Sequence, residues 1–160
     1  MKKTTLVLRF ALLALAMAGI AHWASKNFGP RSEIAAGPTA DDPLAGRDHG
    51  VVVTYFTSDA RCPTCLKIEQ LTHRAVTERL ANELAERSVV FRTLNIDRPE
   101  NERFTKRYDL VFKTVVVSER RSGEETRWVA LDEVWDLTGK PDEFIELIHK
   151  AVRSYLDSDA

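Results

Sequence analysis

The chain has only two cysteines, Cys62 and Cys65, and only two residues separate them. A disulfide between them would close a very short loop, and the stabilising effect of a disulfide grows with the length of the loop. Such a bridge would therefore add little to the stability of a fold. Thiol-disulfide redox chemistry or the binding of a soft metal ion explains this spacing better.

The residues around the pair predict that it lies at the start of a helix. Residues 51–57 are β-branched and aromatic, as expected of a buried strand, and the polar turn 58–61 follows them. Pro63 suits the first position of a helix, because the N–H that it lacks has no partner there. Cys62 then faces the free N–H groups of the helix start, and Cys65 lies one turn later on the same side, so that the sulfurs can meet.

These positions give the two sulfurs different roles. The helix start and the neighbouring Arg61 are expected to lower the pKa of Cys62, which makes it the sulfur that attacks a substrate disulfide. Cys65 is then the resolving sulfur, which breaks the mixed disulfide. The two spacer residues between them are Pro63 and Thr64.

Residue periodicity divides the rest of the chain into strands and helices. The expected segments are a helix over 63–86, a strand over 88–96, a helix over 99–108, strands over 114–118 and 126–130 joined by a turn, a short helical piece over 131–137 and a helix over 141–156. The order β-α-β-α-β-β-α predicts an α/β fold in which a helical crossover joins two parallel strands. The later hairpin adds antiparallel strands, which gives a mixed sheet with helices on both faces.

The N-terminal residues predict a signal peptide or a membrane anchor. Lys2 and Lys3 precede an apolar run that reaches Ala24 and contains one charge, Arg9. The run is close to the shortest membrane span, so cleavage and retention as an anchor through residues 6–24 both stay open. We expect an exported domain, either periplasmic or tethered to the outer face of the cytoplasmic membrane. The expected organisation is a leader over 1–24, a linker over 25–48 and a folded domain over 49–160.

The charge balance limits the classes of partner. Lys and Arg number 23 and Asp and Glu number 24, whereas non-specific binding of nucleic acid needs a basic excess. No Gly-x-Gly-x-x-Gly motif follows any expected strand, so no nucleotide cofactor is expected. The redox centre would be the disulfide itself, with no further cofactor.

The sequence around the pair resembles the thioredoxin superfamily over about residues 50–156. A strand, a turn, the Cys-Pro-Thr-Cys motif over residues 62–65 and a long helix carry this resemblance. More narrowly, residues 61–69 with Trp128 and Trp135 downstream are similar to the exported ArsF-type family, also called nitrophenyl compound nitroreductase subunit. The resemblance implies a thiol-disulfide oxidoreductase or dithiol electron carrier with a dedicated protein partner, such as a membrane or reductase component.

Two positions depart from the thioredoxin pattern. Thioredoxins place a proline before the third strand, facing the cysteines, but residues 111–115 contain no proline. Lys113 or Phe112 takes that place, so the docking of a peptide substrate is expected to differ. Thr54 takes the place of a buried acid in the first strand and cannot relay a proton. The residues expected to support the cysteine pair are Arg61, Pro63, Thr64, Lys113 and Thr114.

Two alternative functions stay open. The two thiolates alone could bind a soft metal ion or an arsenical, and the domain could be a non-catalytic docking subunit of a reductase or transporter system. A zinc site needs at least three protein ligands, and the cysteines supply two. His73 lies eight residues beyond Cys65, about 12 Å along the helix, and His49 is expected at the far end of the first strand. Neither histidine is therefore expected to complete a zinc site with the cysteines.

Several other residues receive a structural interpretation. Tyr55, Trp128 and Trp135 are expected in packing rather than in a cofactor site. Lys113 is expected to be a solvated charge at a strand edge rather than a catalytic amine. The glutamates expected on the solvated face of the long helix are Glu69, Glu78, Glu83 and Glu86.

Overall fold

The computed structural model describes residues 43–44 and 46–159. The leader expected over 1–24 and most of the expected linker lie outside the described residues. Within the described part, none of the helices combines the length and the apolar character that a membrane crossing needs.

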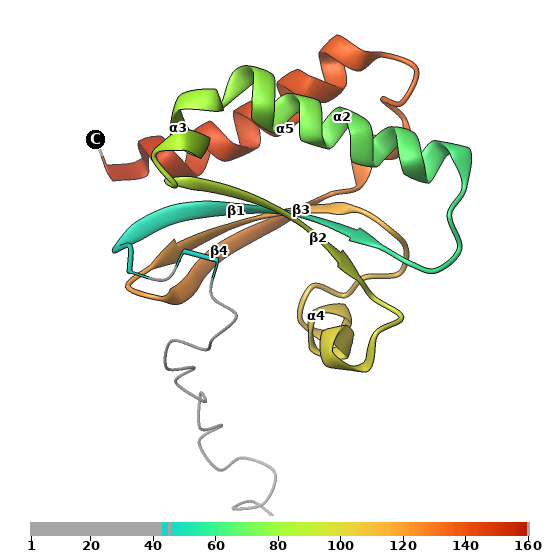
Figure 1. Ribbon diagram of the computed structural model, residues 1–160, viewed down its shortest axis with the longest axis horizontal. Coiled ribbons are helices and arrows are strands. Elements are labelled where there is room, and N and C mark those ends of the chain that lie inside the picture. Colours follow the sequence, from blue (N-terminus) through green and yellow to red (C-terminus); the bar gives the residue numbers. More distant parts are fainter. Residues whose placement is uncertain (1–42, 45, 160) are drawn as a thin grey trace, which may run out of the picture. The chain divides into compact units, whose positions relative to one another are not determined.

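The sheet is mixed and contains four strands in the order β2-β1-β3-β4 (Figure 1). β1 (His49–Thr57) pairs in parallel with β2 (Val89–Asn95) and antiparallel with β3 (Val115–Arg121), and β3 pairs antiparallel with β4 (Glu124–Leu131). The crossover between the parallel strands contains α2 (Pro63–Arg79). The predicted α/β class, element order, parallel pair and hairpin are confirmed.

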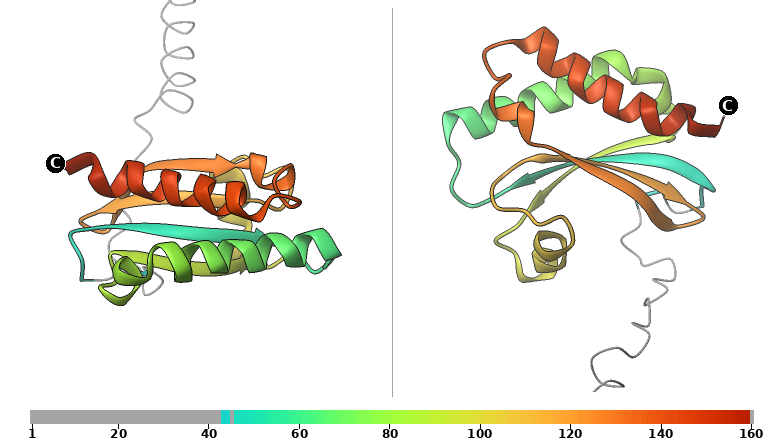
Figure 2. Two further views of the ribbon diagram at one scale, coloured as in Figure 1. Left: turned by 90° about the horizontal axis from the view of Figure 1, so that it is seen from above. Right: turned by 180° about the vertical axis from the view of Figure 1, so that it is seen from behind.

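Helices cover both faces of the sheet, as predicted. α2 and α5 (Pro141–Leu156) lie side by side on one face (Figure 2), and α4 (Glu102–Arg107) lies on the other (Figure 1). The predicted bounds of the last helix, 141–156, are those of α5. The remaining short helical segments are α3 (Ala81–Ala85), η1 (Pro99–Asn101), η2 (Asp132–Trp135) and η3 (Asp157–Asp159).

The helix predicted over 63–86 is interrupted, which corrects the prediction. α2 ends at Arg79, and the separate helix α3 begins at Ala81. Leu80 lies between them with φ −130° and ψ 30°, outside the helical region, and its side chain is fully buried. The Leu80 side chain belongs to the main core, and its burial stabilises the fold by removing apolar surface from water.

The two strands of the hairpin are longer than predicted. β3 was expected over 114–118 and continues to Arg121, and β4 was expected over 126–130 and spans Glu124–Leu131. The charged end of β3 does not resemble a buried strand in sequence. It nevertheless pairs with β1 and β4, and Glu119 is buried there with its carboxylate hydrogen-bonded.

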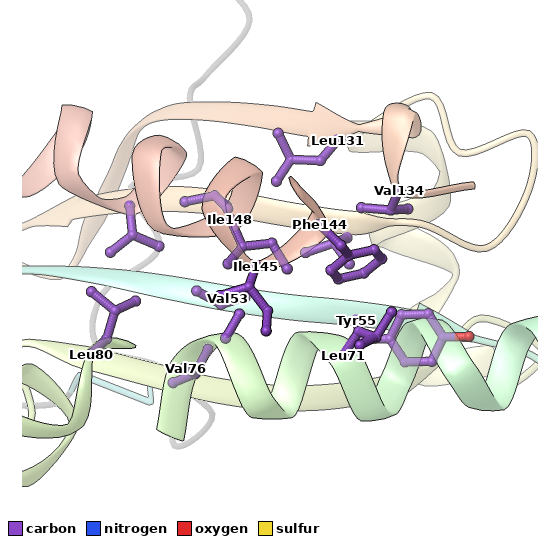
Figure 3. Packing of buried hydrophobic residues seen from close by; sticks show 14 of the residues in the cluster. Val53, Tyr55, Leu71, Val76, Leu80, Leu131, Val134, Phe144, Ile145 and Ile148 are labelled. Atoms are coloured by element: carbon purple, nitrogen blue, oxygen red, sulfur yellow. The ribbon is translucent and has the colours of Figure 1, made fainter. Parts of the chain in front are cut away.

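The main core lies between the sheet and the helices α2 and α5 (Figure 3). Successive side chains of a strand point to opposite faces of the sheet. Val53 and Tyr55 of β1 therefore belong to this core, whereas Phe56 packs in a second cluster with Phe104 and Tyr108, on the face that α4 covers. Burial on both faces explains why the sequence of β1 is almost continuously apolar.

Candidate redox site at the start of helix α2

The two cysteines lie where β1 has ended and α2 begins. Cys62 is the N-cap residue of α2, with extended backbone angles, and Pro63 occupies the first turn of the helix. The sulfurs of Cys62 and Cys65 are bonded to each other, and the two Cα atoms are 5.0 Å apart. The backbone N–H of Cys65 also donates a hydrogen bond of 3.1 Å to Cys62 Sγ. The structure thus places the pair at the start of a helix that follows the first strand, as predicted.

The two sulfurs differ in their access to solvent. Cys62 is half-buried, whereas Cys65 is only 1% exposed. Of the two spacer residues, Pro63 is exposed and Thr64 is half-buried. An incoming thiol or disulfide can therefore reach Cys62 more readily than Cys65.

Tyr55 of β1 is hydrogen-bonded to the first turn of α2. Its side chain is fully buried, and its hydroxyl donates a hydrogen bond of 2.9 Å to the backbone oxygen of Cys65. Burial raises the pKa of Tyr55 above its ordinary value, so the hydroxyl keeps its proton. The sequence predicted packing for Tyr55, and the structure adds this direct contact with the site.

Arg61, the residue before Cys62, is paired with a carboxylate. Its guanidinium donates to Thr57 Oγ1 at 3.3 Å and forms an ion pair with Glu69. The Glu69 side chain is 28% exposed, and its carboxylate is paired with Arg61. The structure therefore pairs Arg61 with the carboxylate of Glu69, a contact that the sequence did not reveal.

Asp59 is bound to the end of β2. Its carboxylate accepts hydrogen bonds from Asn95 Nδ2 at 2.7 Å and from Arg98 Nη2 at 2.9 Å. Its backbone N–H donates to Asp97 at 2.8 Å. These contacts fix the loop between β1 and α2 against the loop that follows β2.

Lys113 lies beside the disulfide, and this corrects its interpretation as a solvated charge at a strand edge. Its side chain is half-buried, and its ammonium donates to the backbone oxygen of Ala60 and lies 3.4 Å from Cys65 Sγ. Trp135 fixes the backbone there, because its Nε1 donates a hydrogen bond of 2.7 Å to the Lys113 oxygen. Sequence reasoning placed Lys113 near the cysteines but missed these contacts.

Thr114 links this segment to the sheet. It is buried, its Oγ1 donates to the oxygen of Leu131 at 3.2 Å, and its own oxygen accepts from the N–H of Phe56 at 2.8 Å. Thr114 therefore orders the segment that carries Lys113, and no described hydrogen bond joins it to a sulfur.

Thr54 is 2% exposed, at the position where the resemblance implied a buried acid. Its Oγ1 accepts a hydrogen bond of 3.0 Å from Arg92 Nε of β2. The sequence gave no signal for this contact, because it depends on the register of two parallel strands.

The histidines of the described residues lie away from the disulfide. His49 begins β1, at the opposite end of the strand, and its ring nitrogen lies 3.1 Å from Glu119. His73 is exposed and packs edge-on against Phe91. Across residues 43–44 and 46–159, no group of three or more His, Cys, Asp or Glu side chains is placed to hold a metal ion.

Other predicted surface residues have mixed outcomes. Glu78 is exposed and pairs with Arg74, as expected of a solvated helix face. Glu83 instead is half-buried and pairs with Arg153 of α5, which corrects that expectation. Trp128 is 40% exposed and packs against Tyr108 with ring centroids 5.1 Å apart, which agrees with surface packing.

The chain matches no protein-family model, and no curated protein matches its sequence. Its structure is similar to several thioredoxins. A mutant thioredoxin from Halobacterium salinarum shares 21% identity, with a TM-score of 0.39, and the match covers 70% of this chain and 81% of that one. Thioredoxin f2 from Chlamydomonas reinhardtii shares 18% identity, with a TM-score of 0.38 and coverage of 67% and 83%. A thioredoxin from Trypanosoma brucei brucei shares 23% identity, with a TM-score of 0.34 and coverage of 61% and 76%.

Proposed function

We propose that the chain is a thiol-disulfide oxidoreductase, or a dithiol carrier of electrons, of the thioredoxin superfamily. The observation that carries the proposal is the bonded pair at the start of α2, in which an accessible Cys62 is joined to a buried Cys65. A helix N-terminus stabilises a thiolate, and the N–H of Cys65 already points at Cys62 Sγ. The arrangement therefore favours Cys62 as the attacking thiolate in the reduced state and as the sulfur that a partner thiolate attacks in the disulfide.

The reaction with a partner disulfide has two steps. The Cys62 thiolate attacks one partner sulfur, which forms a mixed disulfide and releases the other partner sulfur as a thiolate. The Cys65 thiolate then attacks Cys62 Sγ, closes the intramolecular disulfide and releases the first partner sulfur. Two electrons pass from the pair to the partner, and the partner sulfurs take up the two protons that the pair gives up. The reverse sequence oxidises a partner dithiol.

We also propose that the domain is exported and serves a dedicated protein partner. The apolar N-terminal run after Lys2 and Lys3 supports export, and the segment around the motif supports the ArsF-type subfamily. The absence of a proline at Lys113 supports a dedicated partner, because it alters the surface on which thioredoxins dock peptides. N-terminal sequencing of the chain recovered from the cell envelope would separate the two cases. A chain that begins at Met1 keeps the run as an anchor, and a chain that begins after the apolar run has lost it as a cleaved signal.

The decisive experiment traps the mixed disulfide. Cys65→Ala removes the resolving sulfur, so this variant should form a stable mixed disulfide with a model disulfide through Cys62. The matched control is Cys62→Ala, which should react far less because the remaining sulfur is buried. If Cys65→Ala traps no mixed disulfide, and the natural chain turns over no model disulfide across a range of redox buffers, the proposal is wrong. Stoichiometric uptake of Cu(I) or As(III) by the reduced chain, lost in either Cys→Ser variant, would favour soft-ion binding instead.

A further inference from the structure

Lys113 is the cation in direct contact with the disulfide. Its Nζ lies 3.4 Å from Cys65 Sγ and donates to the oxygen of Ala60. The contact is with the buried sulfur, not with the accessible one at the cap of the helix. Two positive influences therefore act on the pair, the helix start on Cys62 and an ammonium on Cys65.

The backbone that carries Lys113 is fixed from two sides. Trp135 Nε1 donates to the oxygen of Lys113 at 2.7 Å, and the ring of Trp135 packs edge-on against Phe112. Thr114 is buried and hydrogen-bonded to Leu131. These contacts keep the backbone of residues 112–114 in place beside the disulfide, so the base of the Lys113 side chain is positioned.

The charge of Lys113 is not compensated by a carboxylate within the described residues, whose ion pairs include none that involves it. The other ionisable groups around the pair are Tyr55, whose hydroxyl contacts the backbone of Cys65, and Arg61, which is paired with Glu69. Because the charges of Arg61 and Glu69 are paired with each other, Lys113 supplies the positive charge that can interact with a negatively charged sulfur.

We propose that the Lys113 ammonium stabilises a thiolate on Cys65 when the disulfide opens. This inference rests on the proposed exchange reaction. When a partner thiolate attacks Cys62 Sγ, the bond to Cys65 breaks and Cys65 leaves with the electron pair, directly beside the ammonium. In the opposite direction the same thiolate is the attacking group, so Lys113 acts in both.

The direct test measures the pKa of the Cys65 thiol in a Cys62→Ser background, from the pH dependence of thiolate absorbance or of alkylation. Serine is a preferred N-cap residue, so the helix start should be kept. Adding Lys113→Met should raise the pKa of Cys65 by about 1 to 3 pH units, the usual effect of a nearby opposite charge. Lys113→Arg should retain most of the lowered pKa. Lys67→Met, at an exposed lysine of α2, is the matched control and should leave it unchanged.

A second test uses the chain with both cysteines. Lys113→Met should make reduction of the disulfide less favourable by about tenfold or more at a pH where the thiolate forms, which lowers the reduction potential by about 30 mV or more. The difference should vanish in acid, where both thiols are protonated. Exchange with a partner thiol should slow by roughly 3- to 30-fold, from the dependence of exchange rates on thiol pKa.

The two proposals fail in different ways. An unchanged Cys65 pKa and an unchanged potential in Lys113→Met would overturn the role of Lys113, whether or not the chain exchanges disulfides. An equal shift in Lys67→Met would overturn it too, because the effect would then be one of overall charge. A shifted pKa without any mixed disulfide in the trapping experiment would support the contact with Lys113 and reject the oxidoreductase function.

Discussion

Glu119 is a buried carboxylate at the end of the sheet opposite the disulfide. Its side chain is 1% exposed, and its oxygens accept hydrogen bonds from Arg127 Nε and Thr126 Oγ1, each at 2.7 Å, and from Arg121 Nη2 at 2.7 Å. His49 and Ser158 also contact it. The cluster joins the start of β1, the hairpin and the C-terminal residues, so its loss should destabilise the domain.

The change Glu119→Gln removes the charge and keeps the size of the side chain. Removing one partner of a buried ion pair costs about 3–5 kcal/mol. The cations left behind are partly solvated, because the side chains of His49, Arg121 and Arg127 are 24%, 36% and 45% exposed. Solvation of these cations reduces the expected loss in the free energy of unfolding to about 2–3 kcal/mol. For a domain of this size, the midpoint of thermal unfolding should fall by about 8–12 °C.

The assay compares urea and thermal unfolding of the natural chain and the variant, both in the oxidised state. Glu124→Gln is the matched control, since Glu124 is an exposed residue of the same hairpin and its change should cost less than about 0.5 kcal/mol. The reduction potential should stay the same in Glu119→Gln, because the disulfide lies at the other end of β1. A loss below about 0.5 kcal/mol in Glu119→Gln would refute the reasoning.

The dependence on pH gives a second criterion. Hydrogen bonds from Arg127 hold the pKa of Glu119 well below its ordinary value, although burial acts in the opposite direction. A carboxyl with a lowered folded pKa stabilises the fold fully above its unfolded pKa of about 4.3, and this contribution is lost as the pH falls further. The difference between the natural chain and Glu119→Gln should therefore be full at pH 7 and shrink below about pH 4. A difference that grew in acid would contradict the assignment.

Two further changes test the core and the support of the site. Tyr55→Phe removes the hydroxyl that contacts the Cys65 oxygen and should lower the free energy of unfolding by about 1 kcal/mol, measured by urea titration of the oxidised chain; an unchanged midpoint would mean that the bond contributes nothing. Phe144→Ala removes a fully buried ring between α5 and the sheet and should cost about 3–5 kcal/mol in the same titration, with exposed Phe112→Ala as the control. Equal losses in these two phenylalanine variants would argue against the described core.

The order of strands and helices could be predicted from local patterns. The start of α2 was visible because Pro63 and the preceding apolar strand mark it, and α5 because its apolar residues recur at helical spacing. The break at Leu80 was not visible, since a buried leucine suits a continuous helix equally well. The end of β3 was missed because Glu119 is charged, and only the folded state brings the arginines to it.

The site was only half accessible from the sequence. Cys62 and Cys65 are close in the chain, so their meeting follows from helix geometry alone. The contacts of Tyr55 with Cys65 and of Trp135 with Lys113 depend on how α2 and η2 lie against the sheet. No pattern within a single segment contains that information.

Cys65 is held within the domain, whereas Cys62 lies ahead of the first helical turn. Opening the disulfide can therefore leave the helix in place, because α5 and the sheet hold it, and the contacts of Asp59 hold the loop before it. The oxidised and reduced states would then share one shape and differ mainly in the charge at a single corner of the surface. A partner that binds only one of the two states would have to recognise that charge.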